Sequence, residues 1–521
     1  MSYTRVAPKH KSHSVRFAGS SILVSIAVLI LTILGAPGAL AEPAPSGEIN
    51  PDSKTELVIT KLEQPDKPGA RATGLPQDPD VIGAMTPIPG VTFTAKLVPG
   101  VDITTPAGWE RAATMTAAEA RPLVADQPVA DTGKTGTDGL LALGGDNGNL
   151  GVGLYLIEET DAPAGVISSA PFLVALPLPN PNNTAEWLYT VYVYPKNAVV
   201  DVGIAVNDQA AVSCGDKVTW TTSNAIPNQT TISDYVTRNL LAPDVYLDSF
   251  DEVTVNLVSA AGGGTALPTL TRGADYTLSE VTVDGQWGFD VTFTKTGRVK
   301  MAEARASDPT ATVVVTYPTR VTGMGEHTNT VLLYVDDADP VTASTVTKWG
   351  ALNILVHEKN NPSNVIPGAT FKLYLSEADA RAGTNPITVG GVSEWTTDNK
   401  GFISIGCLRY SDFVNGLDVD SSDPLYRPYY AMPQSYPKGW TGDMSPLAGI
   451  VNEVTAVDAQ TLVFEVWKGS TPPGPKPPLP DTGVQIAGAT LLAAVLLGGG
   501  WILRSRKRSD DEDDAQAASD S

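Results

Sequence analysis

Histidine and cysteine, the residues that most often build catalytic and metal sites, are scarce in this chain. The 521 residues include four histidines and two cysteines. His10 and His13 lie in the N-terminal segment, so that His327 and His357 remain for the rest of the chain. No Ser-His-Asp set, His-rich metal motif or glycine-rich phosphate loop stands out. We therefore expect no enzyme active site, no metal site and no cofactor.

The two cysteines are far apart. Cys214 and Cys407 are separated by 193 residues, whereas disulfide frameworks and metal sites have clustered cysteines. Either the two bridge a pair of domains, or each is a small buried apolar residue. A bridge needs Cα atoms within about 7 Å of each other. Because the two cysteines fall in different predicted domains, we expect the second arrangement.

Basic residues are the minority among the charged ones. Lys and Arg number 35 against 57 Asp and Glu, which gives a formal net charge of −22. Such a surface repels nucleic acid and anionic membranes, so we expect neither as a partner. Charged residues make up only 18% of the chain, with 48 Gly and 41 Pro. This composition favours an all-β protein of many short strands, and the length allows about three domains.

The N-terminus has the organisation of a secretory signal peptide. Residues 1–41 combine a basic segment, an apolar run from Ile22 to Leu34, and Ala39 and Ala41 at the positions that a signal peptidase inspects. A retained membrane anchor is less favoured, because the apolar run is short for a span. We expect an exported protein.

The C-terminus carries a second targeting pattern. A motif of the form Leu-Pro-x-Thr-Gly is made by Leu479, Pro480, Asp481, Thr482 and Gly483. Residues 484–503 are apolar and match a bilayer core at about 1.5 Å per residue. The basic cluster that opens the tail, 504–521, should keep it in the cytoplasm. A Pro-rich tether precedes the motif, and tether and motif together span 471–483. Such a tether is extended and semi-rigid, so it should hold the motif clear of the folded chain.

A repeat indicates duplicated domains. The sequence Ile-Pro-Gly-(Val/Ala)-Thr-Phe occurs at 88–93 and again at 366–371. A strand-like segment precedes each copy, and a turn and a further strand follow it. Both units then reach an aromatic-to-Pro-x-Gly stretch, at 155–165 and 429–439. We predict tandem β-sandwiches of immunoglobulin type in an elongated rod.

Two further motifs lie in the first unit. The first is a strand-like segment with Trp187, Val191, Val193, Tyr194, Pro195 and Lys196 at its key positions. The second has Tyr155, Glu159, Thr160, Ala162, Pro163 and Gly165. Together with the Leu-Pro-x-Thr-Gly signal, these resemble the pilin motif, the E-box and the wall-sorting signal of sortase-assembled shaft pilins. Such subunits have CnaB-type immunoglobulin-like domains, and actinobacterial type 1 and type 2 fimbrial shaft subunits are examples.

The resemblance implies how the chain polymerises. A sortase cysteine would attack the Thr482 carbonyl and release Gly483 onward, and the Lys196 amine of the neighbouring subunit would then take the acyl group. One chain with both groups builds an open head-to-tail filament. The other interpretation of Lys196 is a surface lysine on a terminal strand.

The resemblance also implies an internal bond between lysine and asparagine in such sandwiches. In the first domain the candidates are Lys61, Asn197 and Glu159, and the alternative is three solvated polar residues. In the middle domain Ile204 stands where the lysine is expected and Asn239 where an aspartate is expected, while Asn329 remains. In the third domain Lys359 is a candidate lysine, but Pro433 stands in the place of Glu159. We predict no internal bond in the middle and third domains.

The expected organisation has seven parts: signal peptide 1–41, N-terminal CnaB-like domain 42–197, middle domain 198–349, C-terminal CnaB-like domain 350–470, tether and motif 471–483, transmembrane helix 484–503 and cytoplasmic tail 504–521. The expected partners are a class C and a housekeeping sortase, identical subunits, ancillary pilins, peptidoglycan, and a host glycan or protein receptor. The expected location is the wall of a Gram-positive cell, with a transient membrane-bound precursor. A monomeric wall-anchored adhesin or an ancillary tip or base pilin is the alternative, and it would not need Lys196.

Overall fold

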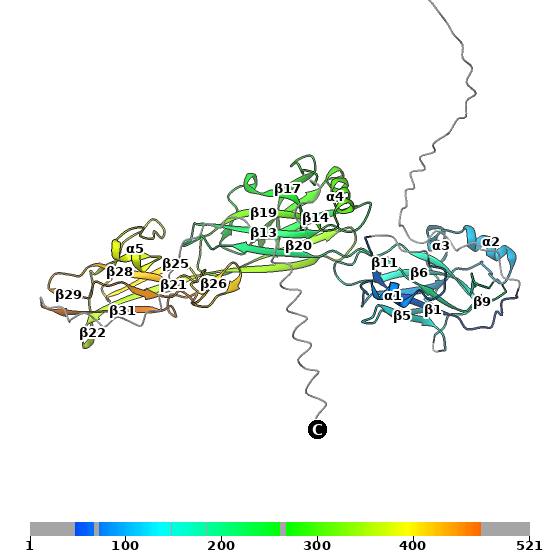
Figure 1. The fold of residues 1–521 in the computed structure, drawn as a ribbon, viewed down its shortest axis with the longest axis horizontal. Helices are drawn as coiled ribbons and strands as arrows, with labels where there is room; N and C mark the ends of the chain where they lie inside the picture. The colour runs from blue at the N-terminus through cyan, green and yellow to red at the C-terminus, as the bar shows by residue number, and fades with distance from the viewer. Residues whose placement is uncertain (1–46, 67–71, 147, 184, 261–266, 470–521) are drawn as a thin grey trace, which may run out of the picture.

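The computed structural model describes residues 47–66, 72–146, 148–183, 185–260 and 267–469. They form three lobes in a row (Figure 1), which we call the first lobe (47–200), the middle lobe (201–349) and the third lobe (350–469). The described part of the chain has no helix long and apolar enough to cross a membrane. The predicted signal peptide, sorting motif, membrane span and tail lie outside these residues.

The first lobe is a β-sandwich with two main sheets, in strand orders β10-β1-β5 and β4-β3-β6-β7. Inward residues alternate along its strands, as in β1, where Leu57 and Ile59 are buried. Its strands are β1 (Glu56–Thr60), β2 (Leu62–Glu63), β3 (Thr92–Leu97), β4 (Asp131–Lys134), β5 (Leu140–Gly144), β6 (Gly153–Asp161), β7 (Phe172–Leu176), β8 (Leu178–Pro179), β9 (Trp187–Leu188), β10 (Thr190–Val193) and β11 (Lys196–Asn197). Its helices are α1 (Pro79–Gly83), α2 (Pro106–Thr114) and α3 (Ala117–Leu123). The short strands β11 and β2 pair in parallel and close one end of the lobe.

The middle lobe packs the sheet β12-β13-β19-β15, with β16 also on β19, against strands β17-β18-β14-β20 and the start of β21. Its strands are β12 (Val202–Asn207), β13 (Lys217–Ala225), β14 (Tyr235–Leu240), β15 (Val245–Tyr246), β16 (Thr254–Ser259), β17 (Tyr276–Val283), β18 (Gln286–Phe293), β19 (Ala311–Val321) and β20 (Gly325–Val335). It also has the 3-10 helix η1 (Phe250–Glu252) and helix α4 (Lys295–Ser307). Trp220, Tyr235 and Tyr317 are among the largest fully buried side chains of its core.

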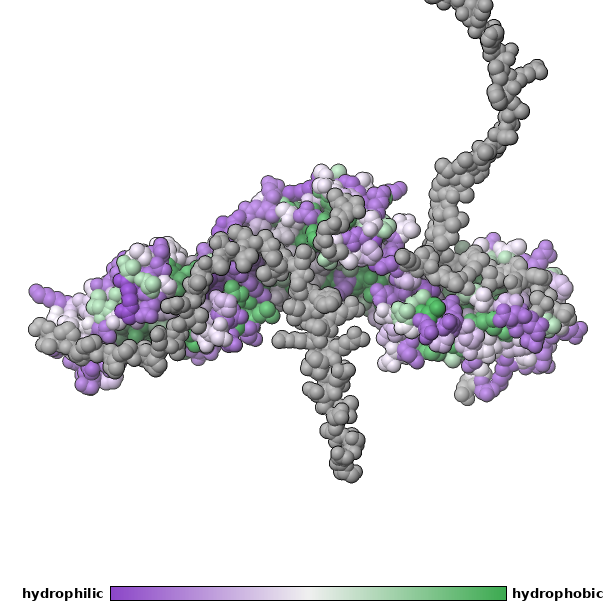
Figure 2. All heavy atoms as spheres, in the orientation of Figure 1, coloured by the Kyte–Doolittle hydropathy of each residue, from purple (hydrophilic) through white to green (hydrophobic). Residues whose placement is uncertain are grey.

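The third lobe is again a sandwich. The second half of β21 pairs with β22, β25 and β31, and the sheet β24-β23-β28-β30 covers it. Its further elements are β22 (Asn361–Val365), β23 (Thr370–Tyr374), α5 (Glu377–Ala382), β24 (Trp395–Thr396), β25 (Phe402–Arg409), β26 (Phe413–Val414), β27 (Leu417–Asp418), β28 (Tyr429–Ser435), β29 (Trp440–Gly442), β30 (Leu447–Gly449) and β31 (Thr461–Lys468). The fold is therefore all-β, as predicted, and apolar side chains form only small patches on the face seen in Figure 2.

One strand runs through both the middle and third lobes. Strand β21 (Val341–Glu358) pairs with β20 along its first half and with β25 and β31 along its second. Trp349 belongs to the middle core and Leu352 to the third core. At Gly350 an added Cβ would lie 2.1 Å from the Glu453 carbonyl oxygen, so the crossing has no room for a side chain. The lobes are therefore joined by a hydrogen-bonded strand.

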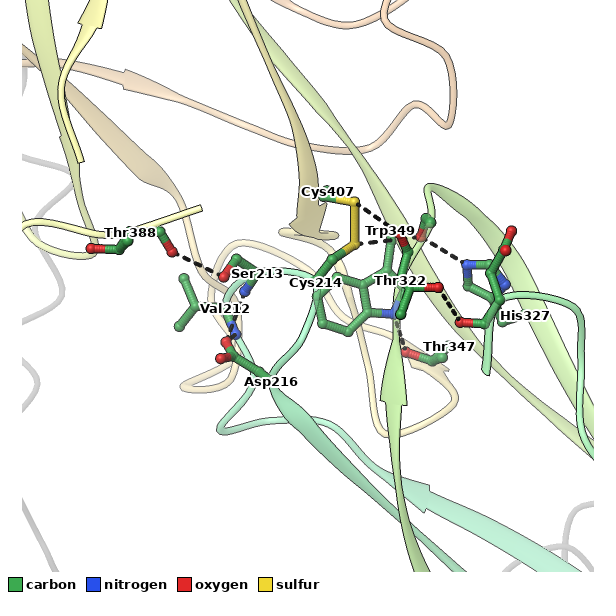
Figure 3. The surroundings of a disulfide bond; sticks show 12 residues. Val212, Ser213, Cys214, Asp216, Thr322, His327, Thr347, Trp349, Thr388 and Cys407 are labelled. Carbon is green, nitrogen blue, oxygen red and sulfur yellow. Dashed lines mark hydrogen bonds between the residues drawn. A yellow bond between two sulfur atoms is a disulfide. The ribbon is translucent and has the colours of Figure 1, made fainter. Parts of the chain in front are cut away.

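The expectation of two unpaired cysteines is wrong. Cys214 and Cys407 form a disulfide with a Cα–Cα distance of 5.1 Å (Figure 3). The segment 208–216 leaves β12 and folds against the third lobe, which brings Cys214 beside the end of β25. Cys214 lies in the middle lobe and Cys407 in the third, and a disulfide can form where the two lobes meet.

Candidate functional site

Lys61 is a buried lysine that directly follows β1. Its side chain is fully buried. Its backbone N–H donates to the Gly139 carbonyl at 2.8 Å, and its carbonyl accepts from the Ile88 N–H at 2.9 Å. These bonds tie the lysine to the Ile-Pro-Gly motif. Among the residues that the structure describes, no other lysine is buried.

Glu159 lies opposite this lysine on β6. A register shift between Thr92 and Phe93 sets Glu159 across from Phe93, itself a fully buried residue. Lys61 Nζ donates to Glu159 Oε1, and the Glu159 side chain is 1% exposed. The same amine lies 5.6 Å from the centroid of the Phe93 ring.

Asn197 completes the trio from β11. Lys61 Nζ donates to Asn197 Oδ1 at 2.6 Å, and Asn197 Nδ2 donates to Glu159 Oε2 at 2.7 Å. The interpretation of three solvated polar residues is therefore wrong, because the structure buries all three and brings them into contact. An amine beside an amide, with one carboxyl group in contact with both, is the arrangement that amide exchange requires.

Burial sets the protonation of the Lys61 amine. It lowers the pKa of Lys61 to about 8, although the charge of Glu159 and its hydrogen bond act in the opposite direction. The neutral amine is the nucleophilic form. Burial therefore raises the share of reactive amine near neutral pH.

Ser169 is a site residue that sequence reasoning missed. Its backbone N–H donates to Glu159 Oε2 at 3.1 Å and its hydroxyl to Oε1 at 2.6 Å. Ser169 follows Gly165, the last residue of the predicted E-box, by four positions, but a lone serine in a loop carries no pattern that would reveal it. Its two hydrogen bonds hold both oxygens of the carboxylate.

Lys196 lies beside Asn197 but faces the other way. Side chains alternate along a strand, so Asn197 points into the core and Lys196 lies half-buried at the surface. Lys196 Nζ donates to the Tyr194 carbonyl at 3.4 Å, and within the described chain it has no ion pair. Burial lowers the pKa of the Lys196 amine.

The other residues of the predicted pilin motif hold this strand in place. Val191 is fully buried and pairs with Leu57 of β1. The Trp187 ring stacks on Trp109 of α2 at 5.3 Å, and its indole N–H donates to the Gly47 carbonyl. Val193 pairs with Ile59 of β1. The Tyr194 hydroxyl accepts from the Gln77 N–H, and the Pro195 carbonyl accepts from the Leu62 N–H.

The predicted E-box ends at the boundary with the middle lobe. Gly165 has a φ of 79°, and an added Cβ would lie 2.5 Å from Val341 and 2.6 Å from the Val200 carbonyl oxygen. Its N–H donates to the Asp339 carbonyl. The Tyr155 hydroxyl donates to the Gly151 carbonyl, and a Cβ added at Gly90 would lie 3.3 Å from the Pro163 ring. Ala162 packs on the core, and Thr160 is exposed at the end of β6. The motif therefore positions Glu159 at one end and joins two lobes at the other.

The third lobe repeats this frame with different side chains. Phe371 pairs with Pro433 after a register shift at Thr370, as Phe93 pairs with Glu159 after a shift at Thr92. Val356 donates to Gly401 and accepts from Ile366, which are the two backbone bonds that Lys61 makes with Gly139 and Ile88. Val356, and not Lys359, therefore occupies the position of Lys61, so the choice of Lys359 is wrong.

The last member of the trio follows from strand pairing. Lys359 N–H donates to the Val466 carbonyl as Gln64 N–H donates to that of Asn197, so Val466 occupies the position of Asn197. Val356 and Val466 are fully buried, and Pro433 is buried as well. Where the first lobe has an amine, a carboxylate and an amide, the third lobe has three apolar side chains.

The middle lobe has buried polar residues but no buried lysine among the residues that the structure describes. Ile204 on β12 packs against the core, and Asn239 and Asn329 are fully buried on the adjacent strands β14 and β20. Asn329 Oδ1 accepts from the Ala242 N–H at 2.8 Å. No lysine is buried in the described part of this lobe. The absence of an internal bond here and in the third lobe stays a prediction.

Comparison with known proteins gives one consistent family. A family described as Gram-positive pilin subunit D1, N-terminal domain, matches residues 52–198. The type 2 fimbrial subunit of Actinomyces naeslundii is 30% identical over 550 residues, covering 95% of this chain and 98% of that protein. The type 1 fimbrial subunit of Actinomyces viscosus is 28% identical over 539 residues, covering 94% and 98%.

Solved structures share the fold. The fimbrial protein FimP from Actinomyces oris matches with a TM-score of 0.53 and 26% identity, over 81% of this chain and 100% of that one. The full-length major pilin SpaD from Corynebacterium diphtheriae matches with a TM-score of 0.59 and 23% identity, over 81% and 99%. All three lobes, and not the first alone, therefore have counterparts in known proteins.

Proposed function

We propose that this chain, which belongs to the fimbrial subunits of Gram-positive bacteria, is linked to its neighbours in the shaft through Thr482 and Lys196. The observation that carries the proposal is the placement of Lys196. Its amine lies half-buried at the surface, at the last position of the predicted pilin motif. It donates to a single backbone carbonyl and pairs with no carboxylate within the described chain. A lysine with a strong ion pair would be a poorer nucleophile.

The reaction takes place in two steps. The cysteine thiolate of a sortase attacks the Thr482 carbonyl carbon, the Thr482–Gly483 bond breaks, and the amine of Gly483 takes up a proton and leaves. The neutral Lys196 amine of a second subunit then attacks the thioester carbon, the carbon–sulfur bond breaks, and the sortase sulfur leaves with the proton that the amine gives up. Burial lowers the pKa of Lys196, which favours the neutral amine. The catalytic group belongs to the sortase, so this chain acts as donor and acceptor and not as an enzyme.

We also assign an internal amide to the first lobe. Lys61 Nζ attacks the Asn197 side-chain carbonyl carbon, a new C–N bond forms, and the Asn197 nitrogen leaves as ammonia. Glu159 contacts both nitrogens, so it can take the proton from one and give it to the other. Because Asn197 adjoins Lys196, this bond would tie the acceptor strand to β1.

The setting follows from the ends of the chain. We propose export through the 1–41 signal, retention by the 484–503 span, polymerisation by a class C sortase, and final attachment to peptidoglycan by a housekeeping sortase. Ancillary pilins and a host glycan or protein receptor complete the proposed partners. The proposed domains are 42–197, 198–349 and 350–470.

Substitution of Lys196 tests the shaft linkage. We expect Lys196→Ala and Lys196→Arg to abolish the high-mass ladders of wall extracts, since a guanidinium keeps the charge but is not a nucleophile at this pH. Lys54→Ala, which removes an exposed lysine of the same lobe, should leave the ladders intact. Unchanged ladders in the Lys196 variants would favour a monomeric wall-anchored adhesin.

Intact mass tests the internal bond. One amide exchange releases one ammonia, a loss of about 17 Da, and we expect one such loss from the exported chain. Lys61→Arg or Asn197→Ala should each abolish it. A loss of two or more would contradict the prediction for the middle and third lobes.

A further inference from the structure

The segment 208–216 joins the middle lobe to the third lobe through its backbone. Cys214 N–H donates to the Cys407 carbonyl at 2.9 Å, and Arg409 N–H donates to the Val212 carbonyl at 3.1 Å. Ser213 and Leu408 form a β-bridge between these bonds. The Cys214–Cys407 disulfide lies at one end of this contact (Figure 3).

A second group of contacts lies at the start of the same segment. Asp208 is fully buried, and it exchanges hydrogen bonds with Asn415: Asp208 N–H donates to Asn415 Oδ1 at 3.1 Å, and Asn415 N–H donates to Asp208 Oδ1 at 2.8 Å. Thr347 of β21 donates to Asp208 Oδ2 at 2.6 Å. Arg427 donates to the Ala211 carbonyl at 2.7 Å. The segment is therefore built into the third lobe by covalent and polar contacts together.

The two ends of the subunit in a shaft define a path for tension. On the proposed function, the neighbours attach at Lys196 and Thr482, so a pull enters just before β12 and leaves after β31. Strand β31 pairs in parallel with β21, from Asn353 opposite Thr461 to Glu358 opposite Val466. It therefore runs away from the middle lobe toward the far pole of the third lobe (Figure 1). The middle and third lobes both lie on this path.

We propose that the Cys214–Cys407 disulfide is a clamp that carries the tension of the shaft, a covalent bypass that removes the chain between the two cysteines from the tension path. This inference rests on the proposed function for the points where tension enters and leaves. Tension passes from Lys196 along β12 to Cys214, crosses the disulfide to β25, and continues to the C-terminus. The chain between the cysteines contains β13 to β24, which is nearly all of the middle lobe and the start of the third.

The chain segment that the disulfide removes from the tension path is long. The cysteines are 193 positions apart, and an extended chain spans roughly 3.4 Å per residue. Breaking the disulfide would therefore free about 650 Å per subunit, at roughly that rise. Because the two Cα atoms are 5.1 Å apart when folded, almost all of this length is gained. Neither of the two lobes that the disulfide joins has a buried lysine among its described residues, so neither offers the amine for an internal amide.

Single-molecule pulling tests the clamp on the exported chain, residues 42–482, which contains all three lobes. One handle is attached through an azide-bearing residue in place of Lys196, and the other at the C-terminus. We expect the C214S/C407S variant to reach a maximum extension about 650 Å longer than the parent chain, at roughly 3.4 Å per released residue. Equal extension of the two chains would overturn the proposal.

Two controls separate the covalent contribution from folding. Asn415→Ala keeps the disulfide but loses the bond that Asn415 Oδ1 accepts from the Asp208 N–H, so its unfolding force should fall while its maximum extension stays that of the parent. Adding dithiothreitol to a stretched parent molecule avoids any folding defect of the double variant. Two electrons and two protons pass to the disulfide, dithiothreitol closes to its cyclic disulfide, and the extra length should appear. No gain after reduction contradicts the clamp.

The result does not depend on polymerisation, because the handle at residue 196 is chemical. If Lys196 proves unmodified in native fimbriae while the extension changes as expected, the proposed linkage fails and the clamp remains as an interdomain tether. If the linkage is found and the extension does not change, the clamp alone fails.

Discussion

The first and third lobes have the same backbone frame with opposite chemistry at its centre. Lys61 and Val356 make equivalent backbone hydrogen bonds, and Glu159 and Pro433 follow equivalent register shifts. The frame therefore does not need the polar trio to form. It depends on the repeated Ile-Pro-Gly motif, to which the hydroxyls of Thr135 and Thr397 make the same two hydrogen bonds in the two lobes.

The difference indicates why the first lobe keeps its charges. Replacing a buried ion pair with apolar side chains of similar volume is often neutral or stabilising. The third lobe has Val356, Pro433 and Val466 there, and its sandwich is complete. Stability alone does not explain Lys61 and Glu159 in the first lobe. The proposed internal amide would explain them, because Asn197 is the neighbour of Lys196, the proposed acceptor.

The largest expected effect comes from breaking the trio of the first lobe. Glu159→Ala leaves Lys61 buried without its partner, which costs about 3–5 kcal/mol, and it removes the carboxyl group needed for amide exchange. We expect the first lobe to unfold at lower denaturant and the ammonia loss to disappear. Pro433→Ala, the matched change in the third lobe, should cost only about 1–2 kcal/mol because two methylene groups are lost. Equal costs would contradict the comparison.

The reverse change places a charge in the third lobe. Val356→Lys buries an amine that has no carboxylate beside it, and we expect a loss of about 3–4 kcal/mol in the unfolding free energy of that lobe. Adding Pro433→Glu and Val466→Asn should recover part of this loss. Lys359→Ala is the control and should have little effect. A triple variant less stable than Val356→Lys alone would show that positions 356, 433 and 466 are not equivalent to 61, 159 and 197.

The pH dependence of the unfolding free energy also distinguishes the first lobe from the third. In Asn197→Ala the Lys61 amine stays free with a folded pKa of about 8, below its value of 10.5 when unfolded. The unfolded chain binds more protons between these values, so stability should rise with pH, by about 2 kcal/mol from pH 7 to 9.5 at 1.36 kcal/mol per pKa unit. The double variant Lys61→Met with Asn197→Ala, like the third lobe, should lack this rise. A fall in stability over the same range would have the wrong sign.

The smallest effect should be the same in both lobes. The Thr135 hydroxyl accepts from Val91 N–H and donates to the Ile88 carbonyl, and Thr397 does the same with Ala369 and Ile366. Thr135→Val and Thr397→Val should each cost about 1–2 kcal/mol, because a buried N–H loses its partner. Denaturant unfolding of both variants measures this. A cost in only one lobe would show that the shared frame is not used equally.

The motifs predicted the site of the first lobe because each residue has a local marker. Glu159 lies within the predicted E-box and Asn197 follows the predicted pilin motif, and the structure brings both side chains into contact with Lys61. The candidate Lys359 is wrong because the spacing differs between the repeats. Ile88 follows Lys61 by 27 residues, whereas Ile366 follows Val356 by 10. Only the backbone hydrogen bonds define the equivalent position.

Contacts between lobes could not be predicted in the same way. The Cys214–Cys407 bridge depends on the segment 208–216 folding onto the third lobe, and on strand β21 continuing through both lobes. Neither feature has a periodic or motif-level signal, because each depends on how two finished sandwiches meet. Ser169 is similar, since its role exists only after the loop approaches Glu159.

Cross-linked peptides from native fimbriae test the central claim most directly. Proteolysis of purified fimbriae followed by mass spectrometry should yield a branched peptide in which the Thr482 carbonyl is bonded to Lys196 Nζ. Fimbriae in which Thr482 is joined to another lysine, or in which Lys196 is recovered unmodified throughout, would contradict the account.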